Sequence, residues 1–143
     1  MYCPFCSYEE TKVLESRLLE TSMRRRRECL KCKNRFTTYE QAYFQLRVIK
    51  KDGREETFDL QKVTRSMEKA LGKVDSEVLI PLSQKVYQKI LNKKKNHVKS
   101  TLIGKFVLNE LKKVDKIAYL RFASIHKAID DPKVLEKEIN RLT

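Results

Sequence analysis

The sequence has no tryptophan and only three glycines and three prolines among its 143 residues. Low-complexity chains and Gly-rich all-β folds carry more glycine and proline, so both are excluded and a mostly helical chain is expected. No stretch approaches the roughly 18 apolar residues of a membrane span, and the first residues lack the apolar core of a signal peptide. We therefore expect a cytoplasmic protein with no membrane partner.

Acidic residues are also scarce. Lys and Arg total 32 against 19 Asp and Glu, which leaves a net charge of +13. Such a charge favours a polyanionic partner, which could be nucleic acid, nucleotide phosphate or an anionic membrane surface. The first 45 residues hold only +3 of this charge, mainly in an arginine run, and the rest is spread along the remaining chain.

Cysteine is absent after residue 32, and the four that are present form two C-x-x-C pairs, Cys3/Cys6 and Cys29/Cys32. Four thiolates at this spacing predict one tetrahedral zinc ion. Redox-active dithiols, unrelated free thiols and an iron–sulfur cluster are the alternatives, but a redox motif alone does not need a second pair. Because four sulfurs leave no position for water, the zinc is expected to be structural.

The patterning predicts an α+β chain in two parts: a small all-β module over residues 1–45, then a mostly helical domain over residues 46–143 that opens with a β-hairpin. β-Branched and aromatic runs predict strands at 12–18 and 35–39, and the Asp52-Gly53 turn predicts a hairpin joining 44–50 to 55–58. Apolar spacing of three and four predicts five helices after it. We expect their starts at Asp59, beside Pro81, at Ser100, at Asp115 and at Asp131-Pro132, with Gly72 ending the first and the fourth running through Ile129.

The run Arg24-Arg25-Arg26-Arg27 lies on the predicted strand that leads into the second cysteine pair. Successive side chains of a strand point to opposite faces, so four arginines cannot all meet one duplex. With Arg17 and Arg35 they predict a DNA-binding surface that contacts phosphates and guanine edges, although charge runs are most often only solvated. Duplex DNA is preferred over single strands because Phe36 and Tyr39 are better placed to pack on the module than to stack on bases.

Several segments resemble the NrdR family of bacterial transcriptional repressors: CPFC from Cys3, ESR from Glu15, RRRREC from Arg24, RFTTYE from Arg35, VIKKDG from Val48 and YLRFAS from Tyr119. The resemblance spans nearly the whole chain and implies an N-terminal zinc ribbon joined to an ATP-cone. The chain departs from the family pattern at three positions. Ser7 and Lys33 stand where the family usually has glycine after each C-x-x-C, and Glu15 stands where it usually has Asp.

The residues alone indicate a nucleotide site only weakly. A phosphate loop would need glycine at position 99, where Lys99 stands, although Lys50, Lys51 and Lys62 could converge on one polyphosphate. Resemblance to the ATP-cone implies that Val48 and Phe58 line a base pocket, that these three lysines hold phosphates, and that Val63, Ser100 and Ile103 complete the site. Gly104 stands where reductase cones commonly have histidine. No metal or base role is expected for His97 or His126.

The resemblance implies a nucleotide-sensing repressor of ribonucleotide reductase genes and not an enzyme. Its ligands would be one structural zinc ion, ATP and dATP, and its partners operator duplex DNA and further copies of the chain as a homo-oligomer. A reductase subunit is the enzymatic alternative, but reductase chemistry needs free cysteines, and all four here are assigned to the metal. A zinc-ribbon factor that binds RNA polymerase or RNA is a third possibility.

Overall fold

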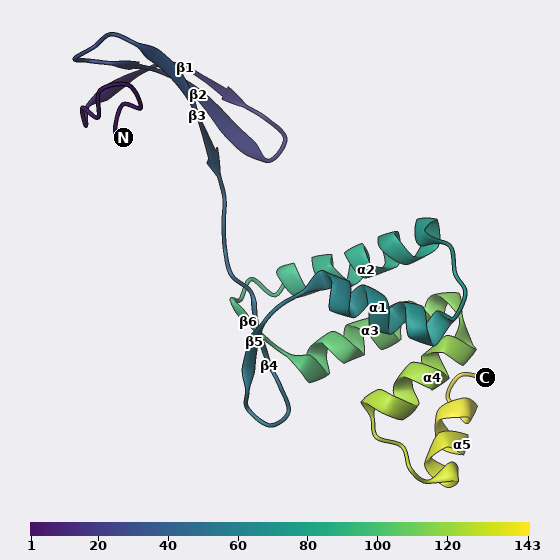
Figure 1. Ribbon diagram of the computed structural model, residues 1–143. Coiled ribbons are helices and arrows are strands. Elements are labelled where there is room, and N and C mark those ends of the chain that lie inside the picture. The colour runs from purple at the N-terminus through teal and green to yellow at the C-terminus, as the bar shows by residue number, and fades with distance from the viewer. The chain divides into compact units, whose positions relative to one another are not determined.

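The computed structural model describes all residues from Met1 to Thr143, which fold as two compact units, Met1–Phe44 and Gln45–Thr143. The first unit is all-β and the second mostly helical, so the α+β class is confirmed (Figure 1). None of the helices combines the length and apolar character needed to cross a bilayer.

The first unit is a three-stranded antiparallel sheet in the order β1-β2-β3, made of β1 (Thr11–Leu18), β2 (Ser22–Cys29) and β3 (Arg35–Gln41). Both predicted strands and the strand that carries the arginine run are confirmed. Cys3 and Cys29 are the only buried residues of apolar type in this unit. The sheet therefore has almost no hydrophobic core, and its centre of burial is the cysteine cluster.

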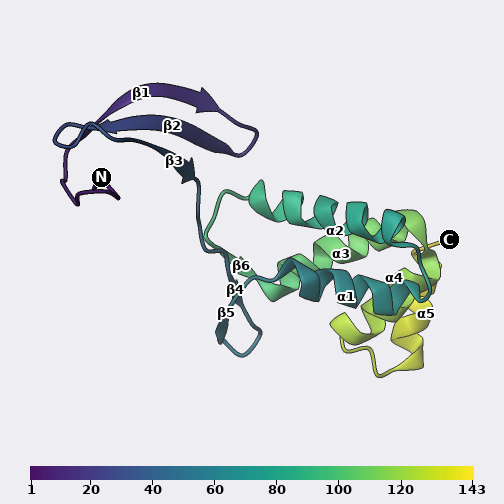
Figure 2. The same ribbon diagram turned by 45° about the horizontal axis from the view of Figure 1, so that its top comes forward.

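The second unit opens with the predicted hairpin, β4 (Arg47–Ile49) and β5 (Glu55–Thr57), which turns through Gly53 at φ +88°. A third strand, β6 (His97–Lys99), lies parallel to β4 and gives the order β5-β4-β6. This strand was not predicted, because its three residues follow a lysine-rich stretch and only Val98 is buried. The small sheet lies at one end of the helices in both views (Figures 1 and 2).

Five helices follow the hairpin: α1 (Leu60–Leu71), α2 (Ser76–Leu91), α3 (Ser100–Val114), α4 (Lys116–His126) and α5 (Pro132–Asn140). The predicted N-caps Asp59, Asp115 and Asp131 all accept backbone N–H bonds from the first turn of their helices. Gly72 ends α1 as expected, with φ +78° and its N–H bonded to the carbonyl of Glu68.

Three predicted boundaries were wrong. Helix α2 begins five residues before Pro81, because Leu79 extends the buried apolar stripe towards the amino end and this burial outweighs the hydrogen bond that proline cannot donate. Ser100 is the first residue of α3, with Lys99 at the cap position. Helix α4 ends at His126 and leaves Ile129 outside, since the chain turns through a positive φ at Ala128.

The core of the second unit packs between α1, α2 and α3, where Met67, Val86 and Leu111 are fully buried. Glu110 on α3 is also buried and accepts hydrogen bonds from Lys89 of α2 and Lys113 of α3. Burial raises the pKa of Glu110, but the two ammonium groups lower it by a larger amount, so the net shift is downward. The paired carboxylate ties α2 to α3 beside the core.

Candidate metal centre, arginine strand and nucleotide cavity

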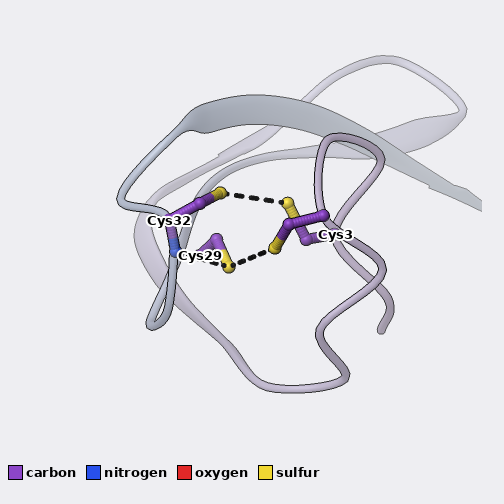
Figure 3. Close-up of side chains that lie close together, drawn as sticks. Cys3, Cys29 and Cys32 are labelled. Carbon is purple, nitrogen blue, oxygen red and sulfur yellow. Dashed lines mark hydrogen bonds between the residues drawn. The ribbon is translucent and has the colours of Figure 1, made fainter.

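The four cysteine sulfurs converge at one end of the sheet of the first unit. The Sγ atoms of Cys3 and Cys32 are 3.6 Å apart, as are those of Cys6 and Cys29, and all four lie within 4.8 Å of one another (Figure 3). Disulfide sulfurs would be separated by about 2.0 Å, whereas Zn–S bonds of about 2.3 Å place tetrahedral sulfurs about 3.8 Å apart. The cluster therefore fits a zinc ion held by four sulfurs, with no ligand position left for substrate.

Each cysteine pair sits on a tight turn in which backbone N–H groups point at sulfur. The N–H of Phe5 donates to Cys3 Sγ, and those of Lys31 and Cys32 donate to Cys29 Sγ, at 3.3–3.4 Å. Burial raises the pKa of the Cys29 thiol, but these donors and the neighbouring thiols lower it by a larger amount, so the net pKa is about 6. Cys29 is thus poised as a thiolate, which is the form that binds zinc.

The residue after each pair has left-handed backbone, Ser7 at φ +59° and Lys33 at φ +63°. Its N–H closes the turn on the carbonyl of the first cysteine, Cys3 at 2.9 Å and Cys29 at 3.1 Å. Glycine adopts this conformation without a Cβ penalty, whereas other residues lose about 1–2 kcal/mol. Both departures from glycine, Ser7 and Lys33, therefore carry left-handed strain in the backbone.

Replacing Lys33 by glycine is expected to stabilise the first unit. Relief of about 1–2 kcal/mol of left-handed strain exceeds the roughly 0.5–1 kcal/mol that glycine loses in conformational entropy, so a net gain of about 0.5–1 kcal/mol is expected. The thermal midpoint of the zinc-loaded ribbon measures it. Lys31→Gly is the matched control, because Lys31 is exposed and has no positive φ; equal effects of the two substitutions would contradict the explanation.

The arginine run occupies the central strand, β2, where successive side chains point to opposite faces of the sheet. Arg25 and Arg27 therefore share one face, and Arg24 and Arg26 share the other. Arg25 donates to Glu40 and Ser16, and Arg27 donates to Thr38 and Thr11. Arg24 and Arg26 make no side-chain hydrogen bond or ion pair in the structure. The register places Arg24 opposite both Arg17 and Tyr39, on the other face from Arg25.

The two remaining predicted DNA-binding residues are each paired with a carboxylate. Arg17 forms an ion pair with Glu15 at 2.5 Å, and Arg35 donates to Glu28 at 3.0 Å. Glu28 is buried on β2 and also pairs with Lys12, and hydrogen bonds from Lys12 and then Arg35 lower its pKa. The structure therefore leaves Arg24 and Arg26 as the guanidinium groups of one face that have no internal partner.

The second unit contains a cavity of about 260 Å³ between the small sheet and helices α1, α3 and α4. The structure brings seven of the eight predicted nucleotide-site residues to its wall: Val48, Lys50, Phe58, Lys62, Val63, Ser100 and Ile103. Phe58 is held there by stacking on Tyr87 of α2, with ring centroids 5.5 Å apart. The wall combines an apolar part suited to a base with lysines suited to phosphate. The ligand roles of these residues stay predictions.

Lys51 is the exception, because its side chain lies outside the cavity. Its Nζ donates to the backbone carbonyl oxygen of His126 at 3.1 Å and so ties the hairpin turn to the end of α4. Adjacent residues of a hairpin diverge, which explains why Lys50 lines the cavity and Lys51 does not.

Gly104 lines the cavity, at the position where the resemblance implied an altered wall. Six further lining residues were not predicted from the sequence: Glu56, Asp59, Ser66, Val107, Phe122 and His126. Glu56 Oε1 lies 3.1 Å from Lys50 Nζ and 3.3 Å from Lys62 Nζ. Hydrogen bonds from these two lysines lower the pKa of Glu56. The carboxylate therefore serves as a counterion for both lysines, at the place where an anionic ligand would meet them. Alternation in β5 was the one available hint, since Glu56 faces opposite to Glu55 and Thr57.

Comparison with known proteins agrees with both units. Residues 1–40 match the family model described as the N-terminal domain of transcriptional repressor NrdR-like proteins, and residues 46–132 match the ATP cone domain. The chain is 42% identical to a transcriptional repressor NrdR of Finegoldia magna over 147 aligned positions, which cover 99% of this chain and 98% of that protein. It is equally similar to one from Thermoanaerobacter sp. strain X514, with 99% and 93% coverage.

The expected resemblance, the zinc ribbon and the ATP-cone are thereby confirmed, and so is the expectation of a regulator instead of an enzyme, since these relatives are named as repressors. The chain belongs to the NrdR family of transcriptional repressors.

Proposed function

We propose that this chain is a cytoplasmic repressor of ribonucleotide reductase genes whose operator binding depends on the nucleotide held by its ATP-cone. The observation that carries the proposal is the cavity of the second unit, which places Lys50 and Lys62 beside an apolar wall within the part that matches the ATP cone. Its volume of about 260 Å³ lies just below the roughly 300–1,000 Å³ typical of small-molecule sites. It suits an adenine base and sugar, with the phosphates reaching the lysines.

A phosphate group in this cavity has to replace a contact that already exists. Lys50 and Lys62 are both paired with Glu56 in the free protein, so only a ligand with several negative charges gains enough from two ammonium groups to displace the carboxylate. A triphosphate is therefore favoured over a nucleoside or a monophosphate. Discrimination between ATP and dATP must depend on the 2′-hydroxyl, either through a partner that dATP leaves unpaired or through a contact surface that fits only one sugar.

The zinc ribbon supplies the second half of the proposal. A sheet with so few free arginines gives weak binding alone, and linked copies gain orders of magnitude only when several can contact DNA together. We infer that ATP or dATP changes how ATP-cone units associate into a homo-oligomer, which sets whether the ribbons engage their operator jointly. Nucleotide occupancy and operator affinity are then coupled through assembly.

Lys62→Ala tests the nucleotide site. Loss of one charge-assisted contact, worth about 1.5–3 kcal/mol, is expected to weaken ATP and dATP binding about 10- to 100-fold and to remove nucleotide-dependent changes in mass and operator affinity. Calorimetry, mass measurement and promoter binding at fixed salt measure these effects. Lys69→Ala is the matched control, because Lys69 is on the same helix but outside this cavity. Unchanged affinity in Lys62→Ala would contradict the site, and equal mass and operator affinity of the wild-type protein with and without nucleotide would contradict the mechanism.

A further inference from the structure

His126 is the last residue of α4, and its half-buried side chain lies on the wall of the cavity. The imidazole stacks on Phe122, one turn earlier on the same helix, with ring centroids 5.6 Å apart and an interplanar angle of 24°. Since Lys50, Lys62 and His126 all line this one cavity, a ligand that fills it meets both the lysines and the ring. Stacking on Phe122 limits the orientations the ring can adopt.

Gly104 on α3 provides the space that this ring occupies. A Cβ built on Gly104 would overlap the His126 ring. Gly104 is buried within a helix and has no positive φ, so no turn requires glycine there. Glycine inside a helix is destabilising by about 0.5–1 kcal/mol relative to alanine. The packing of the imidazole is therefore the reason that the structure offers for glycine at this position.

The surroundings of His126 are mostly cationic. The groups that face it are Lys51 of the hairpin turn, Lys105 of α3 and Lys127 after α4, and the cavity wall adds Lys50, Lys62, Glu56 and Asp59. Burial lowers the pKa of His126. The positive charges of Lys51, Lys127 and Lys105 lower it further, whereas a hydrogen bond with the backbone of Thr101 raises it. The lowered pKa therefore favours the neutral imidazole in the free protein at pH 7. A polyphosphate in the same cavity reverses the sign of the local field and favours the imidazolium.

We propose that His126 is a nucleotide-binding residue of the cavity, and that its imidazole takes up a proton and donates a hydrogen bond to the phosphates when ATP enters. This inference rests on the proposed nucleotide site and adds to it a side chain from α4 that contacts the phosphates. Because the pKa of His126 is then higher in the bound state than in the free state, binding is strengthened as pH falls towards and below the bound-state pKa. The contribution fades at alkaline pH, where both states hold neutral histidine.

The test is calorimetry of ATP binding to the full zinc-loaded chain between pH 6 and pH 8, for the wild type and His126→Phe. Phenylalanine keeps an aromatic ring against Phe122 and Gly104 but cannot donate a hydrogen bond. At pH 6 the wild type is expected to bind about tenfold more tightly, as one charge-assisted hydrogen bond implies, and this ratio should shrink several-fold by pH 8. Comparing the two proteins at each pH cancels the ionisation of ATP itself.

His97→Phe is the matched control, because His97 is the only other histidine and lies exposed on β6, outside the cavity; it should match the wild type at every pH. His126→Asn serves as a second variant if phenylalanine lowers the melting temperature. A wild-type to variant ratio that stays constant with pH, or equals one, overturns the role of His126 while leaving the cavity intact. Failure of the wild type to bind ATP at all overturns the nucleotide site as well.

Discussion

Removing zinc from the folded protein is expected to unfold residues 1–44 and to leave the helical unit folded. The only buried residues of apolar type in the first unit are Cys3 and Cys29, both in the predicted metal site. A sheet of this size cannot offset its conformational entropy without a further source of stability. Structural zinc supplies about 10–16 kcal/mol of binding free energy, which is of the size required. The second unit has its own core around Met67, Val86 and Leu111.

Amide dispersion in NMR spectra, recorded before and after exhaustive chelation under reducing conditions, measures this effect. Signals of the three strands should collapse, those of the helices should persist, and adding one equivalent of zinc should restore the original spectrum. Cys6→Ser provides an independent route to the same state, because it removes one of the four ligands without a chelator. Strand signals that survive in metal-free protein would show that the sheet is stable by itself.

The metal centre and the division of the arginine run were predictable because both depend on local spacing. Two C-x-x-C pairs determine the ligand set, and alternation in a strand determines which arginines share a face. The caps at Asp59, Asp115 and Asp131 are equally local, since each side chain bonds to its own first turn. The sequence also located the hairpin, because the Asp-Gly turn follows the alternating run of residues 44–50 and residues 55–58 can return as the second strand.

The features that were not predictable depend on contacts between segments far apart in the chain. Strand β6 forms because it pairs with β4, about fifty residues earlier, and no local pattern marks it. The start of α2 depends on burial of Leu79 against other helices. His126 lines the cavity because Gly104, 22 positions earlier on another helix, leaves room for its ring. A lone histidine on a helix carries no sequence signal of such a partner.

Replacing Arg24 and Arg26 together by alanine is expected to abolish most operator binding while nucleotide binding is retained. These two side chains share one face of β2 and have no partner within the ribbon, so they are the guanidinium groups most available to phosphates or guanine edges. Each lost phosphate contact lowers the log–log salt dependence by about 0.9, so the double variant should reduce it by about 1.8 for each ribbon that contacts the DNA. Binding to a reductase promoter fragment, measured at several salt concentrations with ATP present, tests both quantities.

Arg25→Ala with Arg27→Ala is the matched control, because it removes the same two charges from the opposite face of the same strand. Arg25 and Arg27 bond to Glu40, Ser16, Thr38 and Thr11. Their loss should therefore mainly lower the melting temperature of the ribbon and have less effect on the salt dependence of operator binding. If net charge alone governed binding, the two double variants would weaken it equally. A larger loss for Arg24 and Arg26 requires that one face of the sheet meets DNA, and equal losses would contradict that assignment.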